Sequence, residues 1–205
     1  MTGPTHRKYS VCFAFIATVI LYRFNFTSIN YYLSLIIILM ASKAGAIFPD
    51  LDHDWHNIGV KTVPNWIINK IIHITGGKHR SWQTHSIDIC AWFTVLAINL
   101  PIIMYNKQMI SEVNKEMLSI LMIGFASGWI SHLYADMLTG EGVRLIFFIN
   151  KKIRLVPKKL GPLVFNTGHE WEKFNYKVMN VINVILGLAC LIYPFIIGYL
   201  EIYKM

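Results

Sequence analysis

Apolar residues gather in five long stretches of this chain, at residues 10–26, 29–48, 87–104, 117–135 and 178–200. A bilayer core of about 30 Å is crossed by roughly 20 helical residues. Four of the stretches come close to that length, and the first is marginal because Arg23 interrupts it. The pattern predicts an all-α, multi-pass transmembrane helical bundle of about five spans, folded as a single membrane-embedded domain over residues 1–205.

Helix-breaking residues separate these stretches. Pro49 follows the second stretch and disfavours helical geometry in the residue before it, so that helix should end there. A short polar connection at residues 106–116 joins the third stretch to the fourth. Glycines and prolines mark residues 137–177 as a long loop, which we expect to lie mostly outside the membrane and to carry one or two short helices.

The composition agrees with a membrane protein. Of the 205 residues, 55% are hydrophobic and 15% charged, and the mean hydropathy is +0.46, which is more apolar than a typical soluble domain. The net charge of +8 is compatible with nucleic-acid binding, but the basic residues lie between apolar stretches, so we expect no direct nucleic-acid partner. The three cysteines lie in apolar stretches without a CxxC pair, which argues against a disulfide framework or a thiolate metal site.

Basic residues are unevenly distributed between the two sides of the predicted bundle. With five spans, residues 1–9, 49–86 and 137–177 share one side, and they hold fourteen of the nineteen Lys and Arg residues. Loops rich in Lys and Arg face the cytoplasm. All eight histidines fall on this same side. We therefore expect the N-terminus and the histidine-rich side to face the cytoplasm.

The fourth stretch carries the strongest candidate for chemistry. Gly124, Gly128, His132 and Asp136 follow one another at intervals of four residues and so form one stripe on a helix. The two glycines permit close helix packing, which turns the stripe toward the bundle. His132 and Asp136 could then bind a metal ion, or form a structural hydrogen bond at the helix end.

A second candidate lies just past the end of the second helix. Asp50, Asp52 and His53 follow Phe48 and Pro49, where carboxylate oxygens can converge on a cation. The alternative is a solvated acidic turn. His56 lies close enough in sequence to add a further ligand or to remain exposed.

A third candidate lies in the loop before the third helix. His79 and His85 are six residues apart and can converge, and the planar guanidinium of Arg80 suits phosphate or carboxylate. The alternative is a basic loop at the membrane surface, with Trp82 at the interface.

Five weaker candidates complete the set. His6 lies near the N-terminus, and the residues before the last stretch offer His169, Glu170 and Glu172 as further ligands or as a general base. Lys43 lies within a predicted span, two helical turns before Asp50, and could share its face or extend to the interface.

The donor atoms of these residues are nitrogen and oxygen, with no thiolate. Such a set favours a divalent metal, zinc above all, with manganese or iron as alternatives. Placed at the cytoplasmic-side helix ends, charged groups of this kind are costly near lipid unless they have a partner. The sequence therefore predicts a metal site there.

Four motifs resemble those of the YdjM-like family, bacterial inner-membrane proteins described as metal-dependent hydrolases. In order, they are residues 1–6 (Met-Thr-Gly-Pro-Thr-His), 49–53 (Pro-Asp-Leu-Asp-His), 79–86 (His-Arg-Ser-Trp-Gln-Thr-His-Ser) and 131–139 (Ser-His-Leu-Tyr-Ala-Asp-Met-Leu-Thr). Residues 167–172 resemble a weaker C-terminal element, and Asp54 and His56 depart from the expected Pro and Ser. The resemblance implies an inner-membrane location. The family's description also mentions LexA binding, for which these residues give no indication, so a protein partner is left open.

The order His, Asp, His, His-x-x-x-Asp is also similar, more loosely, to zinc-dependent phospholipase C and P1-type nucleases. That similarity implies a centre of two or three metal ions. The implied ligands are His6, Asp50, His85, His132 and Asp136. Around them, the implied supporting or substrate-binding residues are Asp52, His53, His79 and Arg80.

Together these observations predict a membrane-bound metal-dependent hydrolase. We expect it to cleave a phosphoester of a membrane lipid, a lipid-linked molecule or a similar anionic substrate by metal-activated water. Asp50 or Asp52 would act as general base, and Arg80 would hold the substrate's charge beside anionic lipid headgroups. One alternative is a metal ion or proton transporter, which would need ionisable groups deep in several spans. The other is a non-catalytic regulatory scaffold, which would tolerate the loss of His132 and Asp136.

Overall fold

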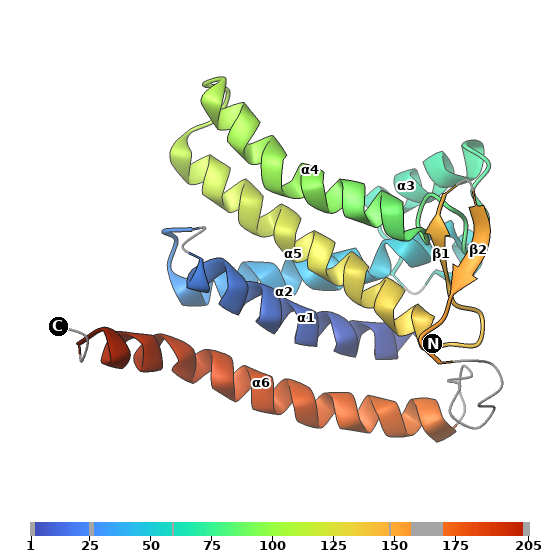
Figure 1. Ribbon diagram of the computed structural model, residues 1–205. Helices are drawn as coiled ribbons and strands as arrows, with labels where there is room; N and C mark the ends of the chain where they lie inside the picture. Colours follow the sequence, from blue (N-terminus) through green and yellow to red (C-terminus); the bar gives the residue numbers. More distant parts are fainter. Residues whose placement is uncertain (1–2, 25–26, 59, 148, 157–169, 203–205) are drawn as a thin grey trace.

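The fold is a bundle of five long helices with a small hairpin at one end (Figure 1). The computed structural model describes residues 3–24, 27–58, 60–147, 149–156 and 170–202. The long helices are α1 (Gly3–Arg23), α2 (Tyr31–Ile47), α4 (Ile87–Asn106), α5 (Glu112–Met137) and α6 (Glu170–Ile202). The expected all-α, multi-pass architecture is therefore confirmed.

Four segments of the described chain are long and apolar enough to cross a membrane. They are Tyr31–Asp52, Ile87–Asn106, Glu112–Met137 and Glu170–Ile197; the first three contain α2, α4 and α5, and the fourth lies within α6. We expected about five spans, and α1 is the helix that does not qualify. It has 21 residues, which is long enough to cross a bilayer, so composition and not length sets it apart.

Polar and charged residues lower the hydropathy of α1; several of the polar side chains face inward, whereas Arg7 and Arg23 are exposed. Thr5, His6, Ser10 and Thr18 are all buried, although each is polar. The Thr18 hydroxyl donates to the carbonyl of Ala14 within the helix, 2.9 Å away. The Ser10 carbonyl accepts from a serine hydroxyl of α2. Packed against α2, α5 and α6, α1 forms part of the bundle, and hydrogen bonds inside it satisfy the Thr18 hydroxyl and the Ser10 carbonyl.

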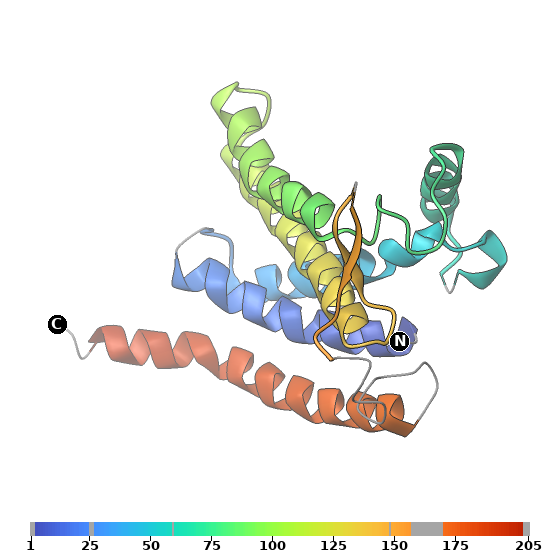
Figure 2. The same ribbon diagram turned by 45° about the vertical axis from the view of Figure 1, so that its right-hand side comes forward.

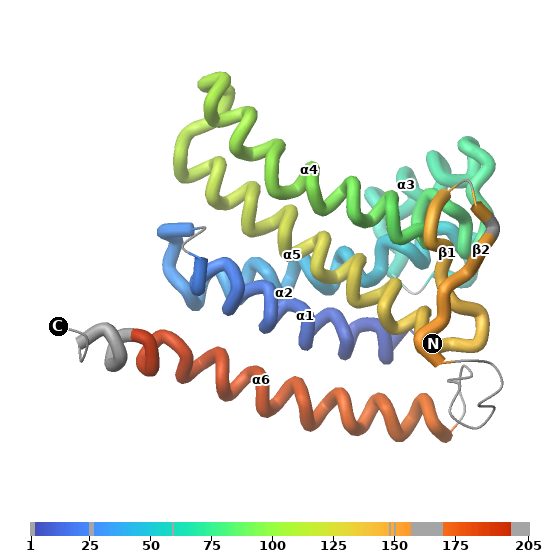
Figure 3. The backbone as a smooth tube through the Cα atoms, viewed as in Figure 1, coloured from blue at the N-terminus to red at the C-terminus, as the bar shows by residue number. Residues whose placement is uncertain are grey.

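The long helices alternate in direction, and this gathers the functional segments at one end. The tube in Figure 3 follows the chain back and forth through the bundle. The starts of α1, α4 and α6 therefore lie beside the ends of α2 and α5. The strands and α3 (Val63–Ile74) lie at this same end in both ribbon views (Figures 1 and 2), and the end of α6 lies at the other.

Close contact between α2 and α5 depends on glycines at their crossing. A methyl group on Gly128 would collide with the carbonyl oxygen of Ser42, and one on Gly45 with that of Phe125. At Gly124 an added methyl carbon would lie 3.0 Å from the Cα of Ile38. The prediction that the Gly124–Asp136 stripe faces the bundle is thus confirmed.

The connection after α5 differs from the expectation of short helices within residues 137–177. Its described part forms an antiparallel hairpin of β1 (Val143–Ile146) and β2 (Ile149–Ile153), and α6 already begins at Glu170. Tertiary contacts favour the extended conformation here, because Arg144 pairs with Ser86 and its backbone N–H donates to the carbonyl of His85. Residues 157–169 of this loop lie outside the described residues.

Short helices occur instead between α2 and α4. They are the 3₁₀ turns η1 (Pro49–Asp52) and η2 (Trp55–Asn57), followed by α3. The side-chain amide of Asn69 in α3 donates to the carbonyls of Leu51 and His53, at 2.7 and 2.9 Å. Helix α3 thereby braces the acidic turn that follows α2.

The arrangement of the helices predicts which loops share a membrane face. With each position replaced by cysteine, an impermeant maleimide should label Lys61→Cys and Lys152→Cys from the cytoplasmic side alone. Lys107→Cys, at the far end of α4, should be labelled only from the opposite side. The wild-type chain, whose three cysteines are buried or half-buried, provides the background. Labelling of Lys61→Cys and Lys107→Cys from one side would contradict this topology.

The glycine crossing makes a second prediction. Gly128→Ala should lower the stability of the folded protein by about 1–3 kcal/mol, because the new methyl group overpacks the α2–α5 contact. Thermal unfolding in detergent would measure this as a lower melting temperature. Gly187→Ala is the matched control, since its methyl group would meet only the tip of the Phe15 ring, at 3.3 Å. Equal melting temperatures for both variants would show that the crossing is not tightly packed.

Candidate metal centre

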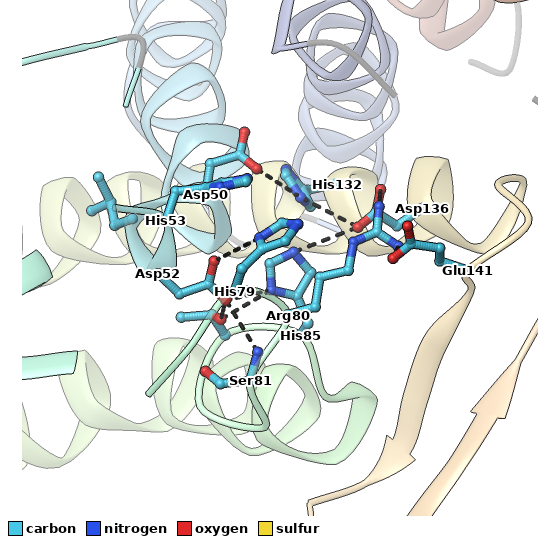
Figure 4. Close-up of polar contacts among 12 residues, drawn as sticks. Asp50, Asp52, His53, His79, Arg80, Ser81, His85, His132, Asp136 and Glu141 are labelled. Atoms are coloured by element: carbon cyan, nitrogen blue, oxygen red, sulfur yellow. Dashed lines mark hydrogen bonds and ion pairs between the residues drawn. The ribbon is translucent and has the colours of Figure 1, made fainter. Parts of the chain in front are cut away.

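Five predicted ligands converge at the end of the bundle where the loops gather. His6 comes from α1, Asp50 from η1, His85 from the loop before α4, and His132 and Asp136 from the last turns of α5. Figure 4 shows the residues from η1, the loop and α5 pointing toward one another. The ligand atoms form two overlapping groups, His6–His132–Asp136 and Asp50–His85–His132, with all atoms of a group within 4.8 Å of one another.

The separations between nitrogen and oxygen are similar across this cluster. One carboxylate oxygen of Asp136 (Oδ1) lies 3.5 Å from His6 Nε2, and the other (Oδ2) lies 3.5 Å from His85 Nε2 and 3.7 Å from His132 Nε2. His132 Nε2 is also 3.7 Å from Asp50 Oδ1. Two atoms that each lie about 2 Å from one tetrahedral ion are about 3.3 Å apart. The cluster is therefore close to the spacing of a shared cation.

His132 presents a single nitrogen to the cluster. Its Nδ1 lies 2.7 Å from the backbone carbonyl of Ala46 in α2. A carbonyl oxygen only accepts, so Nδ1 carries the proton and Nε2 keeps its lone pair. An outer hydrogen bond of this kind orients the imidazole of a metal ligand and fixes its tautomer.

Asp52 holds His85 in the corresponding way. Its Oδ2 accepts from the Thr84 hydroxyl at 2.6 Å, the Ser81 backbone N–H at 3.2 Å and His85 Nδ1 at 3.0 Å. Because a carboxylate only accepts, His85 Nδ1 is the protonated nitrogen, and its Nε2 faces Asp136. Asp52, which is fully buried, thus forms the carboxylate–histidine pair that commonly supports a metal ligand.

The two oriented nitrogens are buried without a hydrogen-bond partner. Neither His85 Nε2 nor His132 Nε2 makes a hydrogen bond to any of the described residues, and both atoms are shielded from solvent. A buried polar atom left in this state is costly in a native protein. A cation between these nitrogens and the carboxylates of Asp50 and Asp136 would satisfy all of them, so the donor set fits a metal.

The remaining two histidines of the predicted site lie beside this cluster. His79 Nδ1 is 3.4 Å from Asp52 Oδ1, and its ring stacks on that of His53, with centroids 3.6 Å apart. Neither residue belongs to the two ligand groups. Burial, and then repulsion by His79, lowers the pKa of His53. His79 thus contacts Asp52, the carboxylate that holds His85.

Arg80 lies against acidic side chains. Its Nη2 is 3.3 Å from Asp136 Oδ1, and its Nη1 is 3.2 Å from Glu141 Oε2 (Figure 4). The residue adopts a φ of 58°, a left-handed conformation that is uncommon outside glycine. This backbone conformation directs the guanidinium to Asp136, so its charge is offset by two carboxylates.

Apart from His6, the weaker candidates lie outside the two ligand groups. Glu172 accepts a 2.8 Å hydrogen bond from Thr5, which joins the starts of α1 and α6 next to His6. Glu170 is exposed and contacts Lys173. Two further candidates, His56 and Lys43, are exposed as well. His169 lies outside the described residues.

Sequence reasoning missed two of the groups that support the ligands. Thr84 was noted only as part of a motif, yet its hydroxyl fixes Asp52, and its carbonyl accepts from Trp129 Nε1 at 2.8 Å. The Ala46 carbonyl, which holds His132, is a backbone group with no side-chain signal. Of these two groups, only Thr84 could have been found from the sequence, because it directly precedes the predicted ligand His85.

Fold and site together define a multi-pass helical membrane protein with a buried His/Asp cluster at one end of its bundle. The family model described as "YdjM inner membrane protein" matches residues 1–200. The chain therefore belongs to the YdjM inner membrane protein family, and the resemblance seen in its motifs is confirmed. No curated protein and no solved structure matches the chain.

The Asp52–His85 pair generates a testable prediction. In Asp52→Asn, the new amide can donate to His85 Nδ1, which moves the imidazole proton to Nε2 and removes the lone pair facing Asp136. Metal affinity, measured by competition with a chelator in detergent, should fall about 10- to 100-fold. Asp54→Asn, at an exposed acid two residues away, should leave the affinity unchanged. Equal affinities in the two variants would refute the orienting role of Asp52.

Proposed function

We propose that this protein is a membrane-bound metal-dependent hydrolase that cleaves a phosphoester of a lipid or a similar anionic substrate. One observation carries the proposal: two buried imidazole nitrogens, on His85 and His132, face carboxylates with no hydrogen-bond partner among the described residues. Their opposite ring nitrogens are already committed to Asp52 and Ala46. A centre so arranged is suited to holding a cation and poorly suited to remaining without one.

The donor set favours zinc, with manganese or iron as alternatives, because it combines imidazole with carboxylate. His132 and His85 each offer one nitrogen, and one nitrogen binds one ion. The two ligand groups share His132, so they describe one centre and not two separate ones. A second ion would need a bridging carboxylate, for which Asp136 is placed with Oδ1 toward His6 and Oδ2 toward the other histidines.

A divalent metal bound there would act as a Lewis acid and lower the pKa of water. Among the carboxylates, Asp50 is the best placed to accept a proton, because its side chain is 31% exposed and lies beside His132. Asp52 is fully buried with both oxygens in contact with the described residues, so it positions His85 instead. Arg80 keeps Asp136 in place while Glu141 offsets its remaining charge.

The location of the centre supports a lipid substrate. It lies where the candidate spans containing α2 and α5 end and where those containing α4 and α6 begin. Lipid headgroups occupy this level of a bilayer. The surplus of Lys and Arg in the loops at this end favours both a cytoplasmic orientation and anionic headgroups.

The rival functions receive less support. A transporter needs ionisable groups along a path through the membrane. Among the described residues, the buried ionisable side chains of α2, α4 and α5 lie near the two ends of the bundle. The cluster is at one end, and Glu116, bound to Ser28, is at the other. A purely structural scaffold does not explain why the ring nitrogens of His85 and His132 are buried without hydrogen-bond partners among the described residues.

Metal analysis tests the centre first. Detergent-purified wild-type protein should contain at least one divalent metal ion per chain, and His132→Ala should lose most of it. His56→Ala removes an exposed histidine and should keep the wild-type metal content. Near-zero metal in all three proteins would refute the centre.

Hydrolysis tests the reaction. Metal-loaded wild-type protein should release phosphate or a phosphorylated headgroup from phospholipids or isoprenoid phosphates. Asp50→Asn should lower that rate by roughly 10²- to 10⁴-fold, the contribution of a general base, and His56→Ala should keep it. A metal-loaded protein inactive on both substrate classes would refute the proposed reaction.

A further inference from the structure

A small cavity opens beside the one ligand that solvent can reach. It has a volume of about 270 Å³, and Arg7, Asp50 and His53 contribute its charged or ionisable side chains. The first turn of α1 and the last turn of α2 form two of its walls, through Pro4 and Ile47. Sites for drug-sized ligands measure roughly 300–1,000 Å³. The cavity is therefore of a size for a phosphate headgroup, not for a whole lipid.

Asp50 connects this cavity to the metal centre. Its side chain is 31% exposed, whereas those of His6, His85, His132 and Asp136 are at most 3% exposed. A group that approaches the centre from solvent therefore arrives past Asp50. The cavity is the space in which that approach takes place.

The charges around the centre leave one arginine uncommitted. A divalent cation would be balanced by Asp50 and Asp136, and Arg80 already contacts Asp136 and Glu141. The Arg7 side chain is exposed and makes no ion pair with any residue in the described parts of the chain. With the metal charge balanced, Arg7 is the positive group that faces the cavity.

We propose that the cavity binds the phosphate group of the substrate and that Arg7 holds its oxygens, which rests on the proposed function. The planar guanidinium can donate two parallel hydrogen bonds to one phosphate. Consecutive helical residues point about 100° apart, so α1 turns His6 into the cluster and Arg7 into the cavity from a single turn. Arg7 takes the substrate-binding role that the sequence suggested for Arg80.

Calorimetric titration of inorganic phosphate into zinc-loaded protein tests this site without relying on turnover. Wild-type protein should bind phosphate, and Arg7→Gln should bind it roughly 10- to 100-fold more weakly, the loss expected for charged hydrogen bonds. Arg7→Lys keeps the positive charge but loses the planar guanidinium, so its phosphate affinity should lie between those of wild type and Arg7→Gln. Arg23→Gln is the matched control, because it removes an arginine from the far end of the same helix and should bind as wild type does. Metal content should be equal in all four proteins.

Two outcomes overturn the proposal: no phosphate binding by zinc-loaded wild-type protein, or equal binding by Arg7→Gln and Arg23→Gln. Competition by vesicles containing phosphatidic acid separates the two sources of phosphate. Displacement of bound phosphate by these vesicles, but not by phosphatidylcholine vesicles, assigns the cavity to a lipid headgroup, and no displacement assigns it to soluble phosphate. Arg7-dependent phosphate binding in a protein that hydrolyses no phosphoester would keep this site and refute the proposed reaction.

Discussion

The close approach of α2 and α5 is the contact on which the rest of the site depends. Glycines at their crossing let the two backbones meet without intervening side chains. This proximity brings the Ala46 carbonyl to His132, and it places Asp50, just past the end of α2, beside the same imidazole. A wider crossing would separate two of the ligand-bearing elements at once, so helix packing and metal chemistry are not independent in this protein.

Around this contact, the centre is supported in layers. The inner atoms are imidazole nitrogens and carboxylate oxygens. A second set of groups orients the side chains that carry them: Asp52, itself held by Thr84, orients His85, and Arg80 contacts Asp136. Helix α3 in turn braces the acidic turn through Asn69. Rigid support of this kind is what a metal ligand set needs to keep its geometry.

Periodic and local features of the site could be predicted from the sequence, whereas features set by distant contacts could not. The four-residue spacing from Gly124 to Asp136 fixes one helix face, and the structure confirms that this face lies inside the bundle. The hairpin after α5 was missed because its strands are short and pair with the loop at His85, a contact that no local pattern encodes. The partners of Arg80 were missed for the same reason, since it meets Asp136 and Glu141 far along the chain.

The end of α2 also affects the chemistry of His132. The last four carbonyls of a helix lack partners within it, and at Pro49, which has no N–H to donate, the chain changes from α2 to the 3₁₀ turn η1. One of these carbonyls, on Ala46, is completed by His132 from another helix. The stop signal of one helix thus sets the protonation pattern of an imidazole on its neighbour. A helix end that supplies no ligand atom of its own is in this sense part of the coordination chemistry, because its free carbonyl leaves Nε2 of His132 to face the cluster.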